Sequence, residues 1–190
     1  DGKTISYTTT GNATYIARFE KTVTQTYKRQ VKNGETWNDT DDDTVGTLSR
    51  YTHTTEYGSE TGATATAGTG YEFVGWYKVE TTGVAETATT GTSLSYTATG
   101  DATYIARFQK VKVTQTYKRQ VKNGERWEAT SDTNVGTVAP ESLIVEYGST
   151  AGSTAEAGEG YAFVGWYDES GTDVAAEKLG AERNILSYTA

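Results

Sequence analysis

Few residues in the sequence could carry out catalysis. His53 is the single histidine and there is no cysteine, so a zinc site or a Cys–His pair has too few ligands to form. A Ser–His–Asp triad needs an imidazole as its base, and the second of the two repeats described below contains no histidine. The sequence therefore predicts no catalytic residues, no enzymatic activity and no cofactor.

The acidic segment "DTDDD" at Asp39–Asp43 is a candidate cation site. An EF-hand loop has acids at its first, third and fifth positions, glycine at the sixth and glutamate at the twelfth. Counted from Asp39, the sixth position is Thr44 and the twelfth is Arg50. The segment is therefore expected to be a solvated loop, and no metal site is predicted.

A row of polar and basic residues could bind a partner. In "VTQTYKRQVKNGE", alternate residues fall on the outward face of a strand, whereas Val23, Tyr27 and Val31 fall on the inward face. If this strand is open, its outward face could dock another protein; the alternative is an ordinary strand face protected by lysines. The candidate binding residues are Thr26, Lys28, Gln30 and Lys32, and their copies Thr116, Lys118, Gln120 and Lys122.

Four tryptophans give a second possible binding surface. Trp76 and Trp166 alternate with other aromatic residues at strand spacing, which favours core positions because each ring buries a large apolar area. A sugar-stacking platform is the alternative. Trp37 and Trp127 lie just beyond a predicted hairpin turn, where they could be exposed or packed.

The elements that position these residues occur twice. Three phrases recur at offsets of 89 or 90 residues: "ATYIARF" at 13–19 and 102–108, "VTQTYKRQVKNGE" at 23–35 and 113–125, and "FVGWY" at 73–77 and 163–167. Two tandem modules follow, predicted at residues 1–92 and 93–190. The position of the boundary between modules remains open, because the phrase beginning "LSYTA" could open a module or close the preceding one.

Both modules are predicted to be mainly β. Thr, Val and Tyr are frequent, and Asn33–Gly34 suits a tight type I′ turn. "LSYTATGDATYIARF" is predicted to form a hairpin, whose second strand has apolar residues on both faces, as is typical of a central strand. A helix is indicated only at Asp173–Gly180. The stretch from Ala102 to Lys122 has no turn residue, so the modules should meet at a short, stiff joint.

The charge of the chain excludes some partners. The net charge is -8, and binding to nucleic acid requires clustered cations, so nucleic acid is not expected. No apolar run approaches the roughly 20 residues of a membrane span, so membrane insertion is not expected either.

One phrase occurs in both modules, as "GYEFVGWY" and as "GYAFVGWY". Each copy is preceded by a strand ending in "EYGS", and the first is followed by "GDATYIARF". This pattern resembles the Listeria–Bacteroides repeat, the B-repeat type of internalin-like surface proteins. The resemblance implies a small β-grasp-like module repeated in tandem on bacterial surfaces, with no catalytic residues to carry over. This chain departs from the family pattern in its longer modules, in "ARF" at the end of the last phrase and in the "TQTYKRQVKNGE" hairpin. An immunoglobulin-like sandwich is the alternative fold.

These observations predict a non-enzymatic tandem repeat region of a secreted or wall-attached Gram-positive surface protein, located outside the cell. The expected partner is a host extracellular protein, either immunoglobulin or a mucin-type glycoprotein, and the chain is expected to be a monomer. The alternatives are a passive stalk of an adhesin and a glycan-binding module.

Overall fold

The computed structural model describes residues 4–80, 83, 85–172 and 185–189, and all of the regular structure in them is β. The first strands are β1 (Thr22–Asn33), β2 (Thr36–Asp39), β3 (Gly46–Leu48), β4 (Thr52–Glu56), β5 (Glu60–Ala67), β6 (Tyr71–Val79), β7 (Ala85–Thr89), β8 (Ser93–Thr97) and β9 (Ala102–Lys110). The later strands are β10 (Lys112–Thr116), β11 (Gln120–Asn123), β12 (Arg126–Ala129), β13 (Gly136–Ala139), β14 (Ser142–Glu146), β15 (Thr150–Ala157) and β16 (Ile185–Thr189). The prediction of a mainly β fold is confirmed, while the choice between β-grasp-like and immunoglobulin-like topology stays a prediction.

The first module consists of two sheets around one core. The larger has the order β2-β1-β9-β6-β7, with β4 also paired to β1, and the smaller has the order β3-β5-β8. Tyr27, Trp76 and Phe108 from the larger sheet share a buried cluster with Leu48 and Leu94 from the smaller one. This burial of aromatic and aliphatic side chains between the sheets is the main source of the module's stability.

The central strand β9 determines the limits of this module. It pairs in parallel with β1 and antiparallel with β6, which confirms the predicted central strand. β8 pairs with β5 and not with β9, so the predicted hairpin at 94–108 is wrong. A break after Thr92 would separate β8 and β9 from the strands that they pair with. We therefore place the end of the first module at Lys110.

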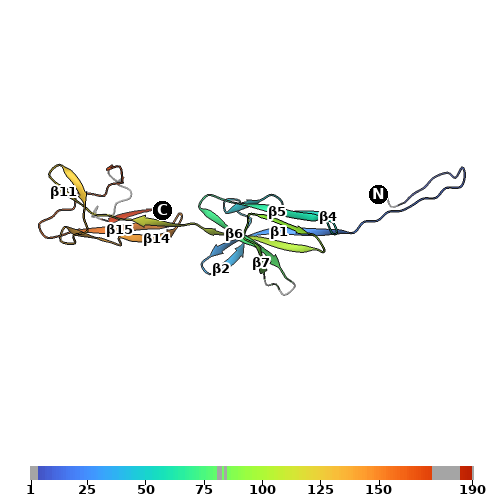
Figure 1. The fold of residues 1–190 in the computed structure, drawn as a ribbon, viewed down its shortest axis with the longest axis horizontal. Helices are drawn as coiled ribbons and strands as arrows, with labels where there is room; N and C mark the ends of the chain where they lie inside the picture. The colour runs from blue at the N-terminus through green and yellow to red at the C-terminus, as the bar shows by residue number, and fades with distance from the viewer. Residues whose placement is uncertain (1–3, 81–82, 84, 173–184, 190) are drawn as a thin grey trace.

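The joint to the second module is a single residue, Val111, between β9 and β10. Its backbone N–H donates to the Gly70 carbonyl at 2.9 Å, and its carbonyl accepts from the Tyr147 N–H at 2.8 Å. Gly70 has φ +77°, and a Cβ there would lie 2.1 Å from the Tyr147 ring. Both modules are therefore held at the joint, and Figure 1 shows them arranged in line.

The second module has smaller sheets, with the orders β10-β14, β11-β12 and β13-β15-β16. Tyr117, Val138, Ala155, Trp166 and Leu186 form its buried cluster. The helix predicted at Asp173–Gly180 lies outside the described residues.

In the first module, the turn after β1 lies one residue later than predicted. Asn33 pairs with Thr36 and still belongs to the strand, so Gly34 and Glu35 form the turn.

Each core contains a tyrosine pair joined to a glutamine. The hydroxyls of Tyr27 and Tyr96 lie 3.0 Å apart, and the Tyr96 hydroxyl donates to the Gln25 side chain at 3.0 Å. Tyr117, Tyr188 and Gln115 repeat the arrangement. Burial, followed by the hydrogen bond with Tyr27, raises the pKa of Tyr96, and burial with the Tyr188 hydrogen bond raises the pKa of Tyr117.

These raised pKa values predict a loss of stability in alkali. Unfolded tyrosines ionise near the ordinary pKa of 10.0 while Tyr96 stays protonated in the folded chain, so the unfolded state releases more protons above that pH. We expect the urea midpoint to fall as the pH rises above about 10. In a Tyr96→Phe variant, the urea midpoint should fall less steeply with pH, although the variant is less stable at neutral pH. An equally steep fall in both proteins would contradict the assignment of this effect to Tyr96.

Candidate functional site

The repeated thirteen-residue stretch forms the centre of the larger sheet. Val23, Gln25, Tyr27 and Arg29 are buried on its inner face. The four predicted binding residues of this copy, Thr26, Lys28, Gln30 and Lys32, alternate with them on the other face. In this copy β1 is not an open strand, because it pairs with β2 and β4 along one edge and with β9 along the other. Only the side chains are therefore available to a partner.

The neighbouring strands add aromatic and basic residues to the same face. Cross-strand pairing places Trp37 beside Lys32, Asp39 beside Gln30, and Arg107 beside Gln30 on the other edge. We call this surface the outer sheet face and define it by Lys28, Gln30, Lys32, Trp37, Asp39, Tyr77 and Arg107.

Arg107 is fixed at the centre of the outer sheet face. Its guanidinium carbon lies 4.2 Å from the centroid of the Tyr77 ring and 4.9 Å from that of the Trp37 ring. Its Nε donates to the Gln30 Oε1 at 3.0 Å. The other guanidinium N–H groups have no hydrogen-bond or ion-pair partner among the described residues. The two rings thus hold a cation whose free donors could receive a carboxylate.

The charge on the outer sheet face is partly balanced by Asp39. The Gln30 Nε2 donates to its Oδ1 at 2.9 Å, and the Lys28 Nζ lies 4.0 Å from its Oδ2. Both side chains of this ion pair are more than half exposed, so the pair contributes little to stability. Asp39 therefore orients Gln30, while Lys28 and Lys32 remain near the surface.

The second copy of the stretch does not form the same face. β10 ends at Thr116 and β11 begins at Gln120, so Lys118 lies between two strands. Lys122 is paired with Trp127, as Lys32 is with Trp37, and Trp127 is exposed. In the described residues of this module, no arginine takes the place of Arg107. The structure thus brings the predicted residues together on one sheet surface only in the first module.

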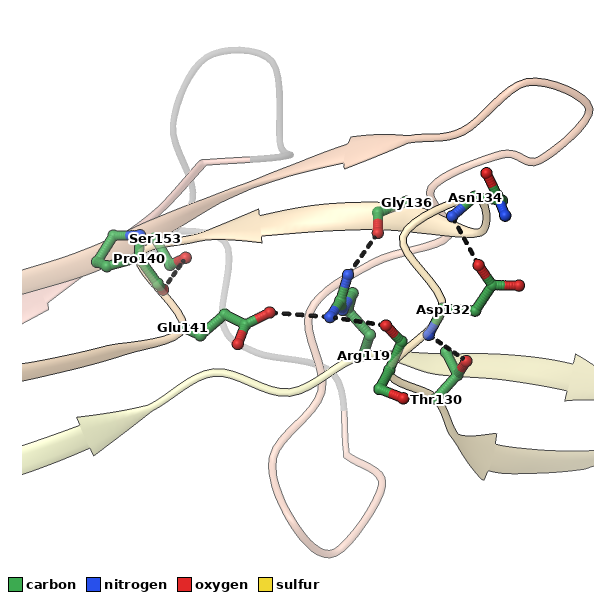
Figure 2. A network of polar contacts seen from close by, with 9 residues as sticks. Arg119, Thr130, Asp132, Asn134, Gly136, Pro140, Glu141 and Ser153 are labelled. Atoms are coloured by element: carbon green, nitrogen blue, oxygen red, sulfur yellow. Dashed lines mark hydrogen bonds and ion pairs between the residues drawn. The ribbon is translucent and has the colours of Figure 1, made fainter.

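Arg29 and Arg119 have a structural role that the sequence pattern did not reveal. The Arg29 Nη1 donates to the Asp43 carboxylate at 2.6 Å and to the Gly46 carbonyl, although its Nε has no partner. Figure 2 shows the matching network of Arg119, which donates to the Gly136 carbonyl at 2.9 Å and to the Glu141 carboxylate at 2.9 Å. Each arginine anchors the loop that follows the hairpin. The acidic partner is Asp43 in the first module and Glu141 in the second, and these two residues do not occupy corresponding positions of the repeat.

The acidic loop is ordered by its own hydrogen bonds. The Thr44 N–H donates to the Asp42 carboxylate at 2.8 Å. The hydrogen bonds from Thr44, with a smaller effect of the Arg29 charge, lower the pKa of Asp42. Asp132 accepts from the Asn134 N–H in the same way. Among the described residues, no group of three or more His, Cys, Asp or Glu side chains is arranged to hold a metal ion.

Chelation of divalent cations is expected to leave the melting temperature unchanged. The Asp42 carboxylate is already satisfied by backbone and hydroxyl donors, so the loop does not require a cation to be ordered. Thermal melts in EDTA and in millimolar Ca²⁺ test this expectation. A Ca²⁺-dependent rise of several degrees, lost in an Asp42→Asn variant, would contradict it.

The remaining candidates occupy structural positions. Trp76 is fully buried and donates its indole N–H to the Thr92 carbonyl at 3.0 Å, and Trp166 is buried as well. Both are core residues as predicted and cannot form a sugar-stacking platform. His53 lies on β4 opposite Gln25. The described residues contain no helix that could span a membrane.

Comparisons with known proteins give one family. The sequence profile of the divergent InlB B-repeat domain matches residues 39–112 and 128–182, which together make up more than half of the chain. The first match ends just after β9, in agreement with the strand pairing. Searches of curated proteins and of solved structures give no match. Modules of this family are repeats of bacterial surface proteins. With two tandem matches, each covering strands of one module, the chain belongs to the divergent InlB B-repeat domain family.

Proposed function

We propose that this chain is a non-enzymatic binding region of a secreted or wall-attached surface protein, and that it docks a host extracellular protein on the outer sheet face. The observation that carries the proposal is Arg107, held against two aromatic rings with guanidinium donors that have no partner among the described residues. A carboxylate of the partner would bind these donors. Immunoglobulin and mucin-type glycoproteins are the partners to test first.

The residue types of the outer sheet face support this proposal. Tryptophan, tyrosine and arginine dominate the binding energy of protein interfaces, and a side chain that is already fixed loses little entropy on binding. Lys28 and Lys32 flank Arg107 on a chain whose net charge is -8. They would steer an acidic surface toward this face and give binding that weakens with salt.

A spacer role is the second candidate, and the joint favours it. Val111 links the modules without a flexible segment, and its hydrogen bonds to Gly70 and Tyr147 hold both sides. A row of such modules would keep a distal binding domain away from the cell wall. Small-angle scattering should give a radius of gyration well above the roughly 16 Å of a compact domain of this length.

The docking proposal predicts a large effect of Arg107→Ala. We expect immobilised immunoglobulin or mucin to bind the parent chain, and Arg107→Ala to weaken the affinity about thirty-fold, equivalent to ~2 kcal/mol. The matched control is Arg50→Ala, an exposed arginine of the same module, which should bind as the parent does.

Charge reversal gives an independent check. The double variant Lys28→Glu, Lys32→Glu should bind more weakly at low salt, whereas Lys118→Glu, Lys122→Glu should have a smaller effect. Retention of parental affinity by both Arg107→Ala and the Lys28/Lys32 variant would place the docking surface elsewhere. Absence of binding to either partner, with the scattering result above, would favour the spacer role. Binding to a glycan array that depends on Trp127 would favour the glycan-binding alternative.

A further inference from the structure

One strand at the border of the second module differs in character from its counterpart in the first. β14 has the sequence "SLIVE", whereas the corresponding strand β4 has the sequence "THTTE". The strands that they pair with are copies of one sequence, because "VTQTYKRQVKNGE" at 23–35 recurs at 113–125. β4 and β14 also show the same alternation of exposed and half-buried residues. The second module therefore presents an apolar strand where the first presents a polar one.

β14 has one open edge. It pairs with β10 on one side, and no other described strand pairs with it. The Tyr147 N–H donates to the Val111 carbonyl at 2.8 Å on the β10 side, so the odd-numbered residues of this segment form the hydrogen bonds to that side. By alternation, the open side receives the N–H and C=O groups of Ser142 and Ile144 and the N–H of Glu146.

This edge is open in a complete module as well. In the first module β4 pairs only with β1, although β9 is in place. β9 joins the sheet between β1 and β6, on the side of β1 that faces away from β4. A β9-type strand in the second module would likewise lie on the far side of β10 from β14. The open edge of β14 therefore belongs to the architecture of the repeat.

An exposed apolar residue lies at the centre of this edge. Ile144 is 65% exposed, and its neighbours Leu143 and Val145 are half-buried on the other face of the strand. In the first module Thr54 takes this position, and its hydroxyl lies 3.4 Å from the Thr24 hydroxyl. Open edges are commonly protected by lysine, proline or a bulge, and "SLIVE" contains neither of these residues. β14 is therefore suited to pair with another strand.

We propose that β14 of one copy pairs antiparallel with β14 of a second copy, about a two-fold axis at Ile144. The order of residues is self-complementary in this register. Ile144 meets Ile144 on the outer face, and Leu143 meets Val145 on the inner face. Ser142 meets Glu146, so no like charges face each other across the contact. The open N–H and C=O groups of the two Ile144 residues bond to each other, and the sheet β10-β14 becomes a four-stranded sheet shared by two copies.

The symmetry of this contact gives a closed dimer. The same edge is used by both copies, so the contact is isologous and leaves no open β14 edge for a third copy. A contact of one short strand is small, and weak association is expected from its size. The proposal replaces the expectation of a monomer.

Salt should strengthen this association. Each chain has a net charge of -8, so two copies repel each other at low ionic strength. Salt screens this repulsion, whereas the apolar and backbone contacts of β14 carry no charge that salt would weaken. The direction is opposite to that expected for host-protein docking through Lys28 and Lys32, so the two contacts can be told apart.

Mass measurements as a function of concentration test the proposal. We expect light scattering to give a mass that rises from 20.5 kDa toward twice that value and then levels off. Ile144→Thr should abolish the rise, because it installs the residue that β4 has at this position. The exposed site tolerates the change, so the variant should fold as the parent does. The matched control is Ile5→Thr, since Ile5 is also 65% exposed, and this variant should associate like the parent.

Single-cysteine variants test the register. The chain has no cysteine, so each introduced thiol is the only one. Antiparallel residues that exchange hydrogen bonds have Cα atoms about 5.5 Å apart, within the range of a disulfide. Ile144→Cys should therefore form a covalent dimer in oxidised glutathione, as should a mixture of Ser142→Cys and Glu146→Cys. Ser142→Cys alone should crosslink much more slowly, because its two copies would lie about 14 Å apart. Thr54→Cys, at the centre of β4, is the control for random collision.

Four results would each overturn the proposal. They are a parent chain that is monomeric up to several hundred micromolar, a mass that continues to rise beyond the dimer, an Ile144→Thr chain that associates like the parent, and crosslinking of Ser142→Cys alone as fast as that of Ile144→Cys. Host-protein binding through Arg107 is measured separately at nanomolar chain concentrations, so failure of one proposal does not imply failure of the other.

Discussion

Replacing Phe108 with alanine is expected to unfold the first module or bring it close to unfolding. The side chain is fully buried between β1 and β6, and it contacts Phe73 within the aromatic core. Removal of a buried phenylalanine costs about 3–5 kcal/mol, a large part of the stability of a small domain. Urea unfolding followed by tryptophan fluorescence measures the effect. The same unfolding curve recorded in a Trp166→Phe background removes the signal from the core of the second module, so that the remaining change reports on Trp76.

Phe19→Ala is the matched control, because Phe19 ends an identical seven-residue phrase. At 94% exposure it should change the unfolding free energy by less than about 0.5 kcal/mol. Equal costs at the two positions would mean that β9 is not the strand that completes the core. The comparison isolates burial, since residue type and local sequence are the same.

Arg29→Ala is expected to be the second severe substitution. Arg29 is buried, and it holds the loop after β2 through the Asp43 carboxylate and the carbonyls of Asp42 and Gly46. Its loss would leave the Gly46 carbonyl without its side-chain donor and would create a cavity beside Tyr51. We expect a cost of about 2–4 kcal/mol, because breaking a buried charged hydrogen-bond network leaves its partners unsatisfied.

The neighbouring Lys28→Ala is the control for Arg29→Ala. Lys28 lies on the opposite face, and its ion pair with Asp39 is long and exposed, so its removal should cost less than about 0.5 kcal/mol. The cost of Arg119→Ala should fall between them, since the Arg119 side chain is 13% exposed, against 3% for Arg29. A Lys28→Ala cost as large as that of Arg29→Ala would show that the two faces of β1 are assigned the wrong way round.

The periodic features of the fold could be predicted from the sequence. Alternation in β1 places Tyr27 inside and Lys28 outside, as observed, and the aromatic spacing correctly predicts Trp76 and Trp166 in the core. The apolar residues on both faces of "ATYIARF" correctly predict a central strand. These features depend on local residue order, which period-two alternation encodes directly.

Strand pairing could not be predicted in the same way. A Gly–Asp turn between β8 and β9 favours a hairpin locally, yet the two strands join different sheets, because long-range burial of Leu94 and Phe108 outweighs the turn. Arg107 was missed for the same reason. Its place between Trp37 and Tyr77 requires the parallel pairing of β1 with β9, a contact between residues far apart in the chain.

The most direct test of the account compares hydrogen exchange in the two copies of the repeated stretch. The sequences are identical, so their intrinsic exchange rates differ little and the comparison reports structure. In β1 the Thr24 N–H donates to Asp101 on the β9 side, and the Tyr27 N–H donates to Tyr51 on the other. By alternation, the amides of Thr26, Lys28 and Gln30 face β9.

We predict slow exchange at these three amides and fast exchange at Thr116, Lys118 and Gln120. A peptide with the sequence of β9 and its preceding turn, "GDATYIARFQK", should slow the second set to rates near those of the first, because it supplies the strand that β1 pairs with in the first module. Equal protection of both copies without the peptide would contradict the central claim, because it would show that the stretch forms an unbroken, paired strand in the second module as well.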